Sequence, residues 1–265
     1  MQNNRAQPWH HADKGQGRPL VLLHGIGMSH QAWKPVMDRL GSQRRVLAFD
    51  IAGFGRTPPL AQGVVPDPAQ LAGALSDSLE ALGVALPVDI AGNSLGGHLA
   101  LECARLGMAR AVVGLSPGGL WPSRDAPPQV HATLRATRWA IQQMPDVSEQ
   151  IMRSVLGRTL ALMLPVTSRG WRLTRAEAVA MARTFAAATA FEATLEAATR
   201  FVGGRDLTLP VTIAFGTRDW LLTGSCQRRD ELPAHTRWLR PEGWGHVPMW
   251  DDPEGVAELI LQGTA

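Results

Sequence analysis

The sequence predicts an α/β fold, and the first observation behind this prediction is a series of short apolar runs. Each run is a few residues long and mainly apolar, without a polar residue at every second position. Continuous runs of this kind favour strands that are buried on both faces, as in a parallel sheet covered by helices. The runs occupy residues 18–25, 44–50, 87–92, 111–117, 210–219 and 236–241.

The second observation is that helix-like segments alternate with these runs. Strand–helix alternation implies a parallel sheet whose strands are joined by right-handed crossovers. The helix-like segments occupy residues 31–41, 67–83, 96–107 and 253–262.

The third observation is that the alternation stops after residue 117. Residues 118–206 have apolar residues at helical spacing, interrupted by Pro and Gly, and the strand pattern resumes at Pro210. A helical block between two strands of one sheet is an insertion, placed to cover the strand ends. We therefore expect an α/β core formed by residues 1–117 and 207–265, with residues 118–206 as a helical lid.

Composition and charge exclude several classes of function. The chain has 265 residues, 45% of them hydrophobic, which is enough for a large core with an appended helical subdomain. The formal charge is only +3, and no run of like charges suggests nucleic-acid binding. We expect a small-molecule substrate as the partner, and no feature of the sequence indicates an oligomeric state.

The two cysteines and the N-terminus indicate the compartment. Cys103 and Cys226 lie far apart and form no metal-binding spacing, so we expect no metal site and a reducing environment. The polar N-terminal segment, residues 1–19, lacks the apolar stretch of a secretion signal, and no apolar run is long enough to span a membrane. We expect a cytoplasmic protein without a membrane association.

The stretch GNSLGG, residues 92–97, carries the strongest chemical signal. It joins a strand-like run to a helix-like one and matches the pattern Gly-x-Ser-x-Gly of a nucleophile elbow, with Gly92, Ser94 and Gly96. The serine there takes a strained backbone conformation, and a Cβ two residues before or after would collide with the adjoining strand or helix. We therefore predict Ser94 as a nucleophile.

A nucleophilic serine needs a base, and the base needs an acid that orients it. His246 is the candidate base because it lies in a Gly-rich loop just before the last helix. Asp219 is the candidate acid because it follows a buried strand, where ligand-handling residues of open α/β sheets collect. Asp125 is a second candidate acid, but it lies in a Pro-rich stretch several residues beyond its strand.

The turn HGIG, residues 24–27, follows the first strand of the α/β pattern. A turn of this type can offer a backbone amide to an oxyanion, and the first amide of the helix after the elbow can offer another. We predict the amides of Ile26 and Leu95 as the two donors. His24 is expected to be a structural hydrogen-bonding residue and not the base.

Five motifs together resemble the α/β-hydrolase superfamily: HGIG, DIAGFGRT, GNSLGG, FGTRD and GWGHVPMWDDPE, in this order. The resemblance covers the whole chain outside the lid. It implies an eight-stranded, mostly parallel sheet with the lid inserted after strand six, a Ser94–Asp219–His246 triad and no cofactor. It also implies a structural role for Asp50 in the second motif.

Within the superfamily, the chain is similar to lidded bacterial serine esterases, lipase-like enzymes and carbon–carbon hydrolases of ring-cleavage products. Haloalkane dehalogenases and epoxide hydrolases have an Asp at the elbow, and epoxide hydrolases also use lid tyrosines, whereas this chain has Ser94 and no Tyr. Hydroxynitrile lyases use a lysine near the site, whereas Lys14 and Lys34 both lie in the N-terminal part. Asn93 matches the carbon–carbon hydrolases, but Val247 follows His246 where those enzymes typically have Trp.

The sequence thus predicts a serine hydrolase that cleaves a carboxylic ester with an apolar acyl or aromatic group. Carbon–carbon hydrolysis of ring-cleavage products is the alternative within enzymes, and a receptor-like ligand-binding protein on the same fold is the alternative outside them. Ligand pockets are lined mainly by apolar side chains. The expected substrate contacts are Met28, Asn93, Trp121, Trp139, Trp220 and Val247.

Overall fold

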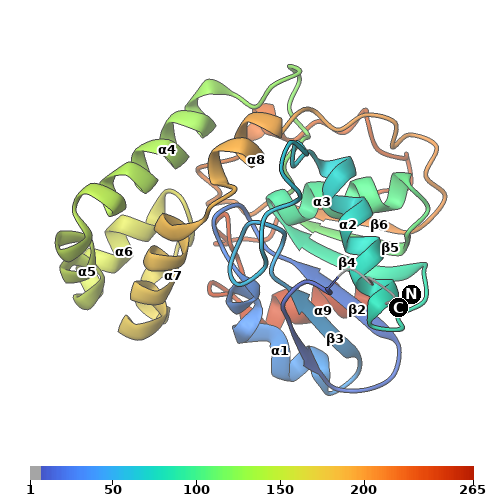
Figure 1. Cartoon of the computed structure of the whole chain (residues 1–265), viewed down its shortest axis with the longest axis horizontal. Coiled ribbons are helices and arrows are strands. Elements are labelled where there is room, and N and C mark those ends of the chain that lie inside the picture. The colour runs from blue at the N-terminus through green and yellow to red at the C-terminus, as the bar shows by residue number, and fades with distance from the viewer. Residues whose placement is uncertain (1–6) are drawn as a thin grey trace.

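The computed structural model describes residues 7–265, which form a seven-stranded sheet with helices on both faces (Figure 1). The strand order is β1-β3-β2-β4-β5-β6-β7, with β1 antiparallel to β3 and all other neighbours parallel. The strands are β1 (His11–Lys14), β2 (Pro19–Leu23), β3 (Arg45–Phe49), β4 (Val88–Asn93), β5 (Ala109–Leu115), β6 (Val211–Ala214) and β7 (Arg237–Leu239).

Burial explains why the strands from β2 to β6 were visible in the sequence, whereas β7 has no buried residue. All six residues of β4 are buried, and four of the five residues in β2 and in β3 are buried, as expected for strands covered on both faces. The edge strand β1 differs, because its sequence HADK is polar and two of its four residues are exposed.

The number of strands differs from the expected eight. Residues 7–265 form seven strands, and the helical insertion follows the fifth strand in the chain, β5, and not the sixth. The stretch from Gln7 to His10, which precedes β1, forms no strand. The predicted absence of a secretion signal concerns a segment that begins in residues 1–6, outside the described residues.

Two pairs of helices cover the two faces of the sheet. On one face α1 (Lys34–Gly41) and α9 (Pro253–Gly263) share an apolar cluster with the sheet. On the other face α2 (Pro68–Ala81) and α3 (Leu95–Arg105) belong to a second cluster. No helix within residues 7–265 is long and apolar enough to cross a membrane.

The helices begin at recognisable capping residues. The Asp67 side chain accepts a hydrogen bond from the Gln70 amide, and Pro68 follows at the first helical position of α2. Asp252 caps α9 in the same way, through the amide of Gly255.

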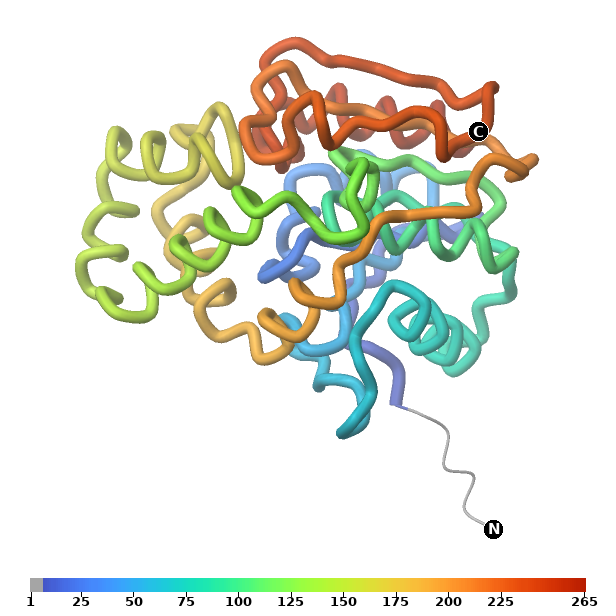
Figure 2. Tube along the Cα trace, turned by 90° about the horizontal axis from the view of Figure 1, so that it is seen from above, coloured from blue at the N-terminus to red at the C-terminus, as the bar shows by residue number. Residues whose placement is uncertain are grey.

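Five α-helices lie between β5 and β6 in the described chain, and most of this block stands beyond one end of the sheet (Figures 1 and 2). This end is where β2 and β4 finish, because residues that follow both strands line a cavity together with residues of the inserted helices. The helices are α4 (Pro128–Gln143), α5 (Pro145–Arg153), α6 (Val155–Met163), α7 (Arg175–Ala187) and α8 (Phe191–Ala197).

Candidate active site

Ser94 occupies a sharp turn between β4 and α3. Its backbone has φ 53° and ψ −113°, a conformation that a residue with a side chain rarely adopts. The turn is held by hydrogen bonds from the Ser94 amide to the Leu115 carbonyl, at 3.0 Å, and from the Gly96 amide to the His24 carbonyl, also at 3.0 Å. The surrounding backbone therefore imposes the strained conformation, which presents the hydroxyl group beyond the end of the sheet.

The glycines on both sides of Ser94 are required by close backbone contacts. A Cβ on Gly92 would lie 2.0 Å from the carbonyl oxygen of Gly96, and a Cβ on Gly96 would lie 2.0 Å from that of Leu23. Both neighbours are backbone atoms, which cannot move aside as a flexible side chain could. The strand and the helix at the elbow can approach this closely only with glycine at both positions.

His246 and Asp219 meet beside the elbow. The Nδ1 atom of His246 lies 3.1 Å from Oδ2 of Asp219, and both side chains are buried. The second carboxylate oxygen of Asp219 accepts hydrogen bonds from the amides of Leu221, at 3.0 Å, and Leu222, at 2.9 Å. These two amides fix the carboxylate, so that it in turn fixes the imidazole.

Electrostatics keep Asp219 ionised. Burial raises the pKa of this carboxyl group, but the charge and hydrogen bond of His246 and the amide of Leu222 outweigh burial, so its pKa lies below the ordinary value. An ionised carboxylate only accepts hydrogen bonds, so Nδ1 of His246 is the donor. The lone pair of Nε2 is then free to take a proton from a hydroxyl group.

The backbone amides of Ile26 and Leu95, beside the elbow, have no hydrogen-bond acceptor within residues 7–265. The amides on either side of Leu95 are used within the turn, and Leu95 itself is the first residue of α3. The N-terminus of a helix favours negative charge. The two amides can therefore serve an anionic oxygen next to Ser94.

His24 has the structural role expected from the sequence. Its Nδ1 atom lies 2.7 Å from the carbonyl oxygen of Gly25, and its Nε2 atom accepts a hydrogen bond from the Ile51 amide at 3.0 Å. Burial lowers the pKa of His24 to about 4, so the ring is neutral near pH 7. A neutral ring matches these two hydrogen bonds, one donated and one accepted.

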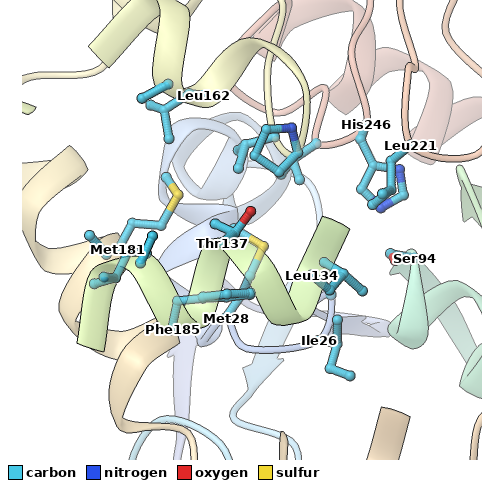
Figure 3. Close-up of a pocket in the computed structure, with 18 of the residues that line it drawn as sticks. Ile26, Met28, Ser94, Leu134, Thr137, Leu162, Met181, Phe185, Leu221 and His246 are labelled. Atoms are coloured by element: carbon cyan, nitrogen blue, oxygen red, sulfur yellow. The ribbon is translucent and has the colours of Figure 1, made fainter. Parts of the chain in front are cut away.

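A cavity of about 290 Å³ lies between the end of the sheet and the helices inserted between β5 and β6, a segment that is called the lid for short, and both Ser94 and His246 line it (Figure 3). Ile26, Met28, Asn93 and Val247 line it as well. The lid contributes mainly apolar side chains: Leu134, Ile141, Ile151, Met152, Leu162, Met181 and Phe185. These lid residues could not be recognised from the sequence as substrate contacts, because helical spacing alone does not reveal which face of each helix is turned to the cavity.

The cavity is almost uncharged. Apart from His246, the described residues that line it include no ionisable side chain, and its other polar side chains are Asn93, Ser94, Thr137 and Ser148. A charged group of a ligand inside the cavity would therefore lose its hydration without gaining an ion pair, which is costly. The arrangement suits an apolar group placed next to a serine hydroxyl.

The three tryptophans expected to contact substrate do not line this cavity. Trp121 is buried in the core, edge-on to the ring of His98. Trp139 on α4 is 61% exposed and Trp220 is 56% exposed, so both side chains point largely to solvent. In α4 the face turned to the cavity carries Leu134 and Ile141, and Trp139 lies on another face.

Asp50 organises a second polar cluster behind the first loop. Its buried carboxylate lies 2.9 Å from Nδ1 of His10 and 2.8 Å from Nδ1 of His30. It also accepts hydrogen bonds from the amides of His30, at 2.6 Å, and Arg56, at 2.9 Å. The three side chains resemble a metal-ligand set in composition. Each carboxylate oxygen, however, already accepts two hydrogen bonds, which fits the structural role expected of Asp50.

A strained serine after a parallel strand, a buried His–Asp pair and a helical lid form the combination typical of lidded α/β hydrolases. A model of the alpha/beta hydrolase family matches residues 20–259. The chain therefore belongs to the alpha/beta hydrolase family.

Similar proteins include several hydrolases. The 2-hydroxy-6-oxo-2,4-heptadienoate hydrolase of Pseudomonas putida is 44% identical over 98 residues, which are 35% of this chain and 34% of that protein, so the match spans about a third of the relative. Epoxide hydrolase EphH of Mycobacterium tuberculosis is 31% identical over 179 residues, 64% of this chain and 83% of the relative. The carboxylesterase CesB of Bacillus subtilis superposes with a TM-score of 0.72 at 20% identity, over 97% of this chain and 89% of that one, and shares the fold.

Proposed function

We propose that this protein is a serine hydrolase that cleaves carboxylic esters with an uncharged, apolar acyl or aromatic group. The observation that carries the proposal is that Ser94, in its strained turn, and the His246–Asp219 pair open onto one apolar cavity. The similarity to an epoxide hydrolase does not change the proposed activity, because epoxide hydrolases have an Asp at the elbow and this chain has Ser94.

In the proposed reaction, Oγ of Ser94 attacks the ester carbonyl carbon while Nε2 of His246 takes the hydroxyl proton. The carbonyl oxygen becomes an oxyanion and accepts hydrogen bonds from the amides of Ile26 and Leu95. The carbon–oxygen bond to the alcohol then breaks, and His246 returns the proton to the leaving alcohol, which leaves an acyl group on Ser94.

Water then attacks the acyl group and gives one proton to His246. Collapse of the second tetrahedral intermediate breaks the bond to Oγ of Ser94, which regains the proton, and releases a carboxylic acid. Asp219 stays ionised throughout and stabilises the imidazolium form of His246. Each of the two oxyanion donors is expected to contribute a factor of about 10² to 10³ to the rate.

The cavity sets the size of the apolar group. An engineered protein cavity of about 150 Å³ holds benzene. This cavity, of about 290 Å³, is roughly twice that size. We therefore expect acyl groups of medium length, such as hexanoyl to decanoyl, or an aromatic group with a short extension.

The lack of a cation in the cavity separates ester cleavage from carbon–carbon cleavage. The relative from Pseudomonas putida is named for a heptadienoate, which is a carboxylate. No Lys or Arg among the described residues lines the cavity here, so a carboxylate would be buried without a partner. This supports an uncharged ester as substrate over a dienoate.

The direct test is Ser94→Ala, measured with 4-nitrophenyl octanoate. We expect turnover to fall by at least about 10⁴-fold, as in hydrolases that lose the nucleophile, with an unchanged melting temperature. Ser123→Ala is the matched control, because Ser123 is exposed, and it should keep full activity. A folded Ser94→Ala protein with wild-type turnover would refute the proposal.

Two further measurements address the alternatives. A fluorophosphonate probe should label Ser94 in the folded wild-type protein, whereas a receptor-like protein would remain unlabelled. Incubation with 2-hydroxy-6-oxo-2,4-heptadienoate should leave its visible absorbance unchanged. Rapid loss of that absorbance, faster than ester turnover, would replace the ester proposal by carbon–carbon hydrolysis.

A further inference from the structure

A buried carboxylate, Asp251, joins the lid to the loop that carries His246. Asp251 is fully buried, and its Oδ1 atom accepts hydrogen bonds from the Thr167 hydroxyl at 2.5 Å and the Arg169 amide at 2.8 Å. Its Oδ2 atom accepts a hydrogen bond from the Gly245 amide at 2.6 Å. One oxygen thus holds the segment that follows α6, and the other holds the residue directly before His246.

Other hydrogen bonds extend the same connection. The amide of Val247, directly after His246, donates to the carbonyl oxygen of Val166 at 2.7 Å. The hydroxyl of Ser168 lies 2.5 Å from the carbonyl oxygen of Gly243 and 3.1 Å from Oδ1 of Asp251. His246 is therefore flanked on both sides by backbone amides that are bonded to the lid or to Asp251.

Arginines from the lid hold Asp251 in place through its backbone. The Nη1 atoms of Arg169 and Arg172 donate to the carbonyl oxygen of Asp251 at 2.9 Å and 2.8 Å. Neither arginine forms an ion pair with the carboxylate within the described chain. Within residues 7–265, the carboxylate thus accepts hydrogen bonds from neutral donors, which belong to the two segments that it connects.

Close packing at Gly245 provides independent support. A Cβ on Gly245 would lie 2.7 Å from the backbone nitrogen of Ser168 and 3.0 Å from Cα of Thr167. The lid backbone therefore lies directly against the loop before His246, with no room for a side chain. Contact this close transmits a displacement of the lid segment to the loop.

We propose that Asp251 is a positioning residue that couples the lid to the orientation of His246. Asp251 touches no reacting atom; it fixes Gly245, and with it the direction in which the next residue presents its imidazole. The bonds between Asp251 and Thr167, Ser168, Arg169 and Gly245 are called the latch below. The proposal rests on the proposed function, because it takes His246 as the base.

The size of the effect follows from geometry. A misplacement of about 1 Å in a catalytic group can cost about 10²-fold in rate. Asp251→Asn keeps the shape of the side chain, but its NH₂ group must face either the Gly245 amide or the donors of the lid. On that side of the latch two hydrogen-bond donors then face each other, and the hydrogen bond is lost. We expect kcat for 4-nitrophenyl octanoate to fall about 10- to 100-fold, with KM within about twofold of wild type.

Thr167→Val tests the lid side alone, because Thr167 does not line the cavity. The valine keeps the volume and removes one donor to Asp251, and we expect kcat to fall about threefold to tenfold, corresponding to one lost hydrogen bond. Thr167→Ser keeps the hydroxyl group and should restore wild-type kcat. In the Thr167→Val protein, hydrogen exchange at the Gly245 and Val247 amides should be faster than in wild type.

Asp252→Asn is the matched control in the same turn. Asp252 bonds to the Gly255 amide and to Nε1 of Trp244, so its loss weakens the start of α9 and not the latch. We expect a lower melting temperature with unchanged kcat. A loss of kcat that merely follows the fall in folded fraction, equal in the Asp251 and Asp252 variants, would show a structural role only and overturn the proposal.

The experiment separates this proposal from the proposed function. A wild-type protein without ester turnover would count against the function, and amide exchange in Thr167→Val would then be the readout for the latch. A wild-type protein with turnover, together with unchanged kcat in both Asp251→Asn and Thr167→Val, would overturn the latch and leave the function standing.

Discussion

The side-chain amide of Asn93 donates a hydrogen bond of 2.8 Å to the backbone carbonyl oxygen of His246. The same amide nitrogen donates to the carbonyl oxygen of Leu115 at 3.0 Å, and Asn93 is fully buried. Asn93 thus lines the cavity, as the sequence analysis expected, and also holds the His246 loop. Asn93 thus holds the loop by a hydrogen bond to the backbone of His246, and Asp251 holds it by a hydrogen bond from the amide of Gly245.

Asn93→Ala should therefore lower both activity and stability. The change leaves the carbonyl group of His246 without its donor, at a cost of about 1–3 kcal/mol, and loosens the His246 loop. The carbonyl group of Leu115 keeps the hydrogen bond from the Ser94 amide. We expect kcat for 4-nitrophenyl octanoate to fall about tenfold, measured beside the melting temperature. Ser78→Ala is the control, because it removes the acceptor of the Trp9 amide far from the site, and it should lower stability only. Equal kcat in the two variants would contradict the prediction.

Asp219→Asn should give the largest loss among variants that keep the shape of the site. An amide can offer its NH₂ group to Nδ1 of His246, which turns the imidazole into the wrong tautomer, and in a serine protease this change lowers kcat about 10⁴-fold. Steady-state kinetics at pH 7 to 8 measure the effect. Asp125→Asn is the matched control, because Asp125 is exposed and its backbone pairs with Thr199. Loss of activity in Asp125→Asn, with Asp219→Asn unaffected, would reverse the assignment.

Leu162→Trp should shorten the range of accepted acyl groups. Leu162 lines the end of the cavity away from Ser94 (Figure 3), and a larger ring there removes space for several methylene groups. At about 0.8 kcal/mol per buried methylene, the ratio of kcat/KM for octanoate to that for acetate should fall about 10- to 100-fold. Leu160→Trp, on the same helix but 59% exposed, should leave the ratio unchanged. An unchanged ratio in Leu162→Trp would mean that the acyl group binds elsewhere.

Stability should fall on acidification because of two buried histidines. Burial lowers the pKa of both His24 and His98 to about 4, whereas an unfolded histidine titrates near 6.5. Between these values the unfolded chain binds protons that the folded chain does not, so stability is complete above pH 6.5 and is lost as pH falls towards 4. Each histidine contributes about 3 kcal/mol to this loss.

Replacing one of these histidines should weaken that pH dependence. Urea unfolding of His98→Gln at pH 7 and pH 5 should show a smaller loss of stability than the wild-type protein shows. His235→Gln is the matched control, because it removes a histidine whose side chain is exposed. If His98→Gln and wild type lost the same free energy of unfolding between the two pH values, His98 would not be one of the titrating groups.

The sequence predicted the parallel strands well because burial on both faces leaves a direct mark. Runs such as PLVLL in β2 have no polar position, and a short strand is the structure that fits the alternation of these runs with helix-like segments. Strand β1 was missed for the same reason: HADK is an edge strand with a polar sequence, and its pairing with β3 depends on backbone hydrogen bonds.

Residues at the site were predictable where a local motif carries the geometry. The Gly92–Ser94–Gly96 spacing records backbone contacts within one turn, so the sequence indicates the elbow directly. The latch has no such mark, because Thr167 and Asp251 are 84 positions apart and each looks like an ordinary loop residue. Trp139 does not line the cavity, and the sequence could not show this, because the composition of α4 does not reveal which of its faces Trp139 occupies.

The segment from Val166 to Arg172 has a consequence for protein engineering. Lids are attractive parts to exchange between relatives when a new substrate range is wanted. Here the segment is hydrogen-bonded to Val247 directly and to Gly245 through Asp251, so a graft that replaced all of residues 118–206 would also replace these partners of the core loop. A chimera should therefore take only the helices up to α6 from the donor and retain residues 166–172 of this chain.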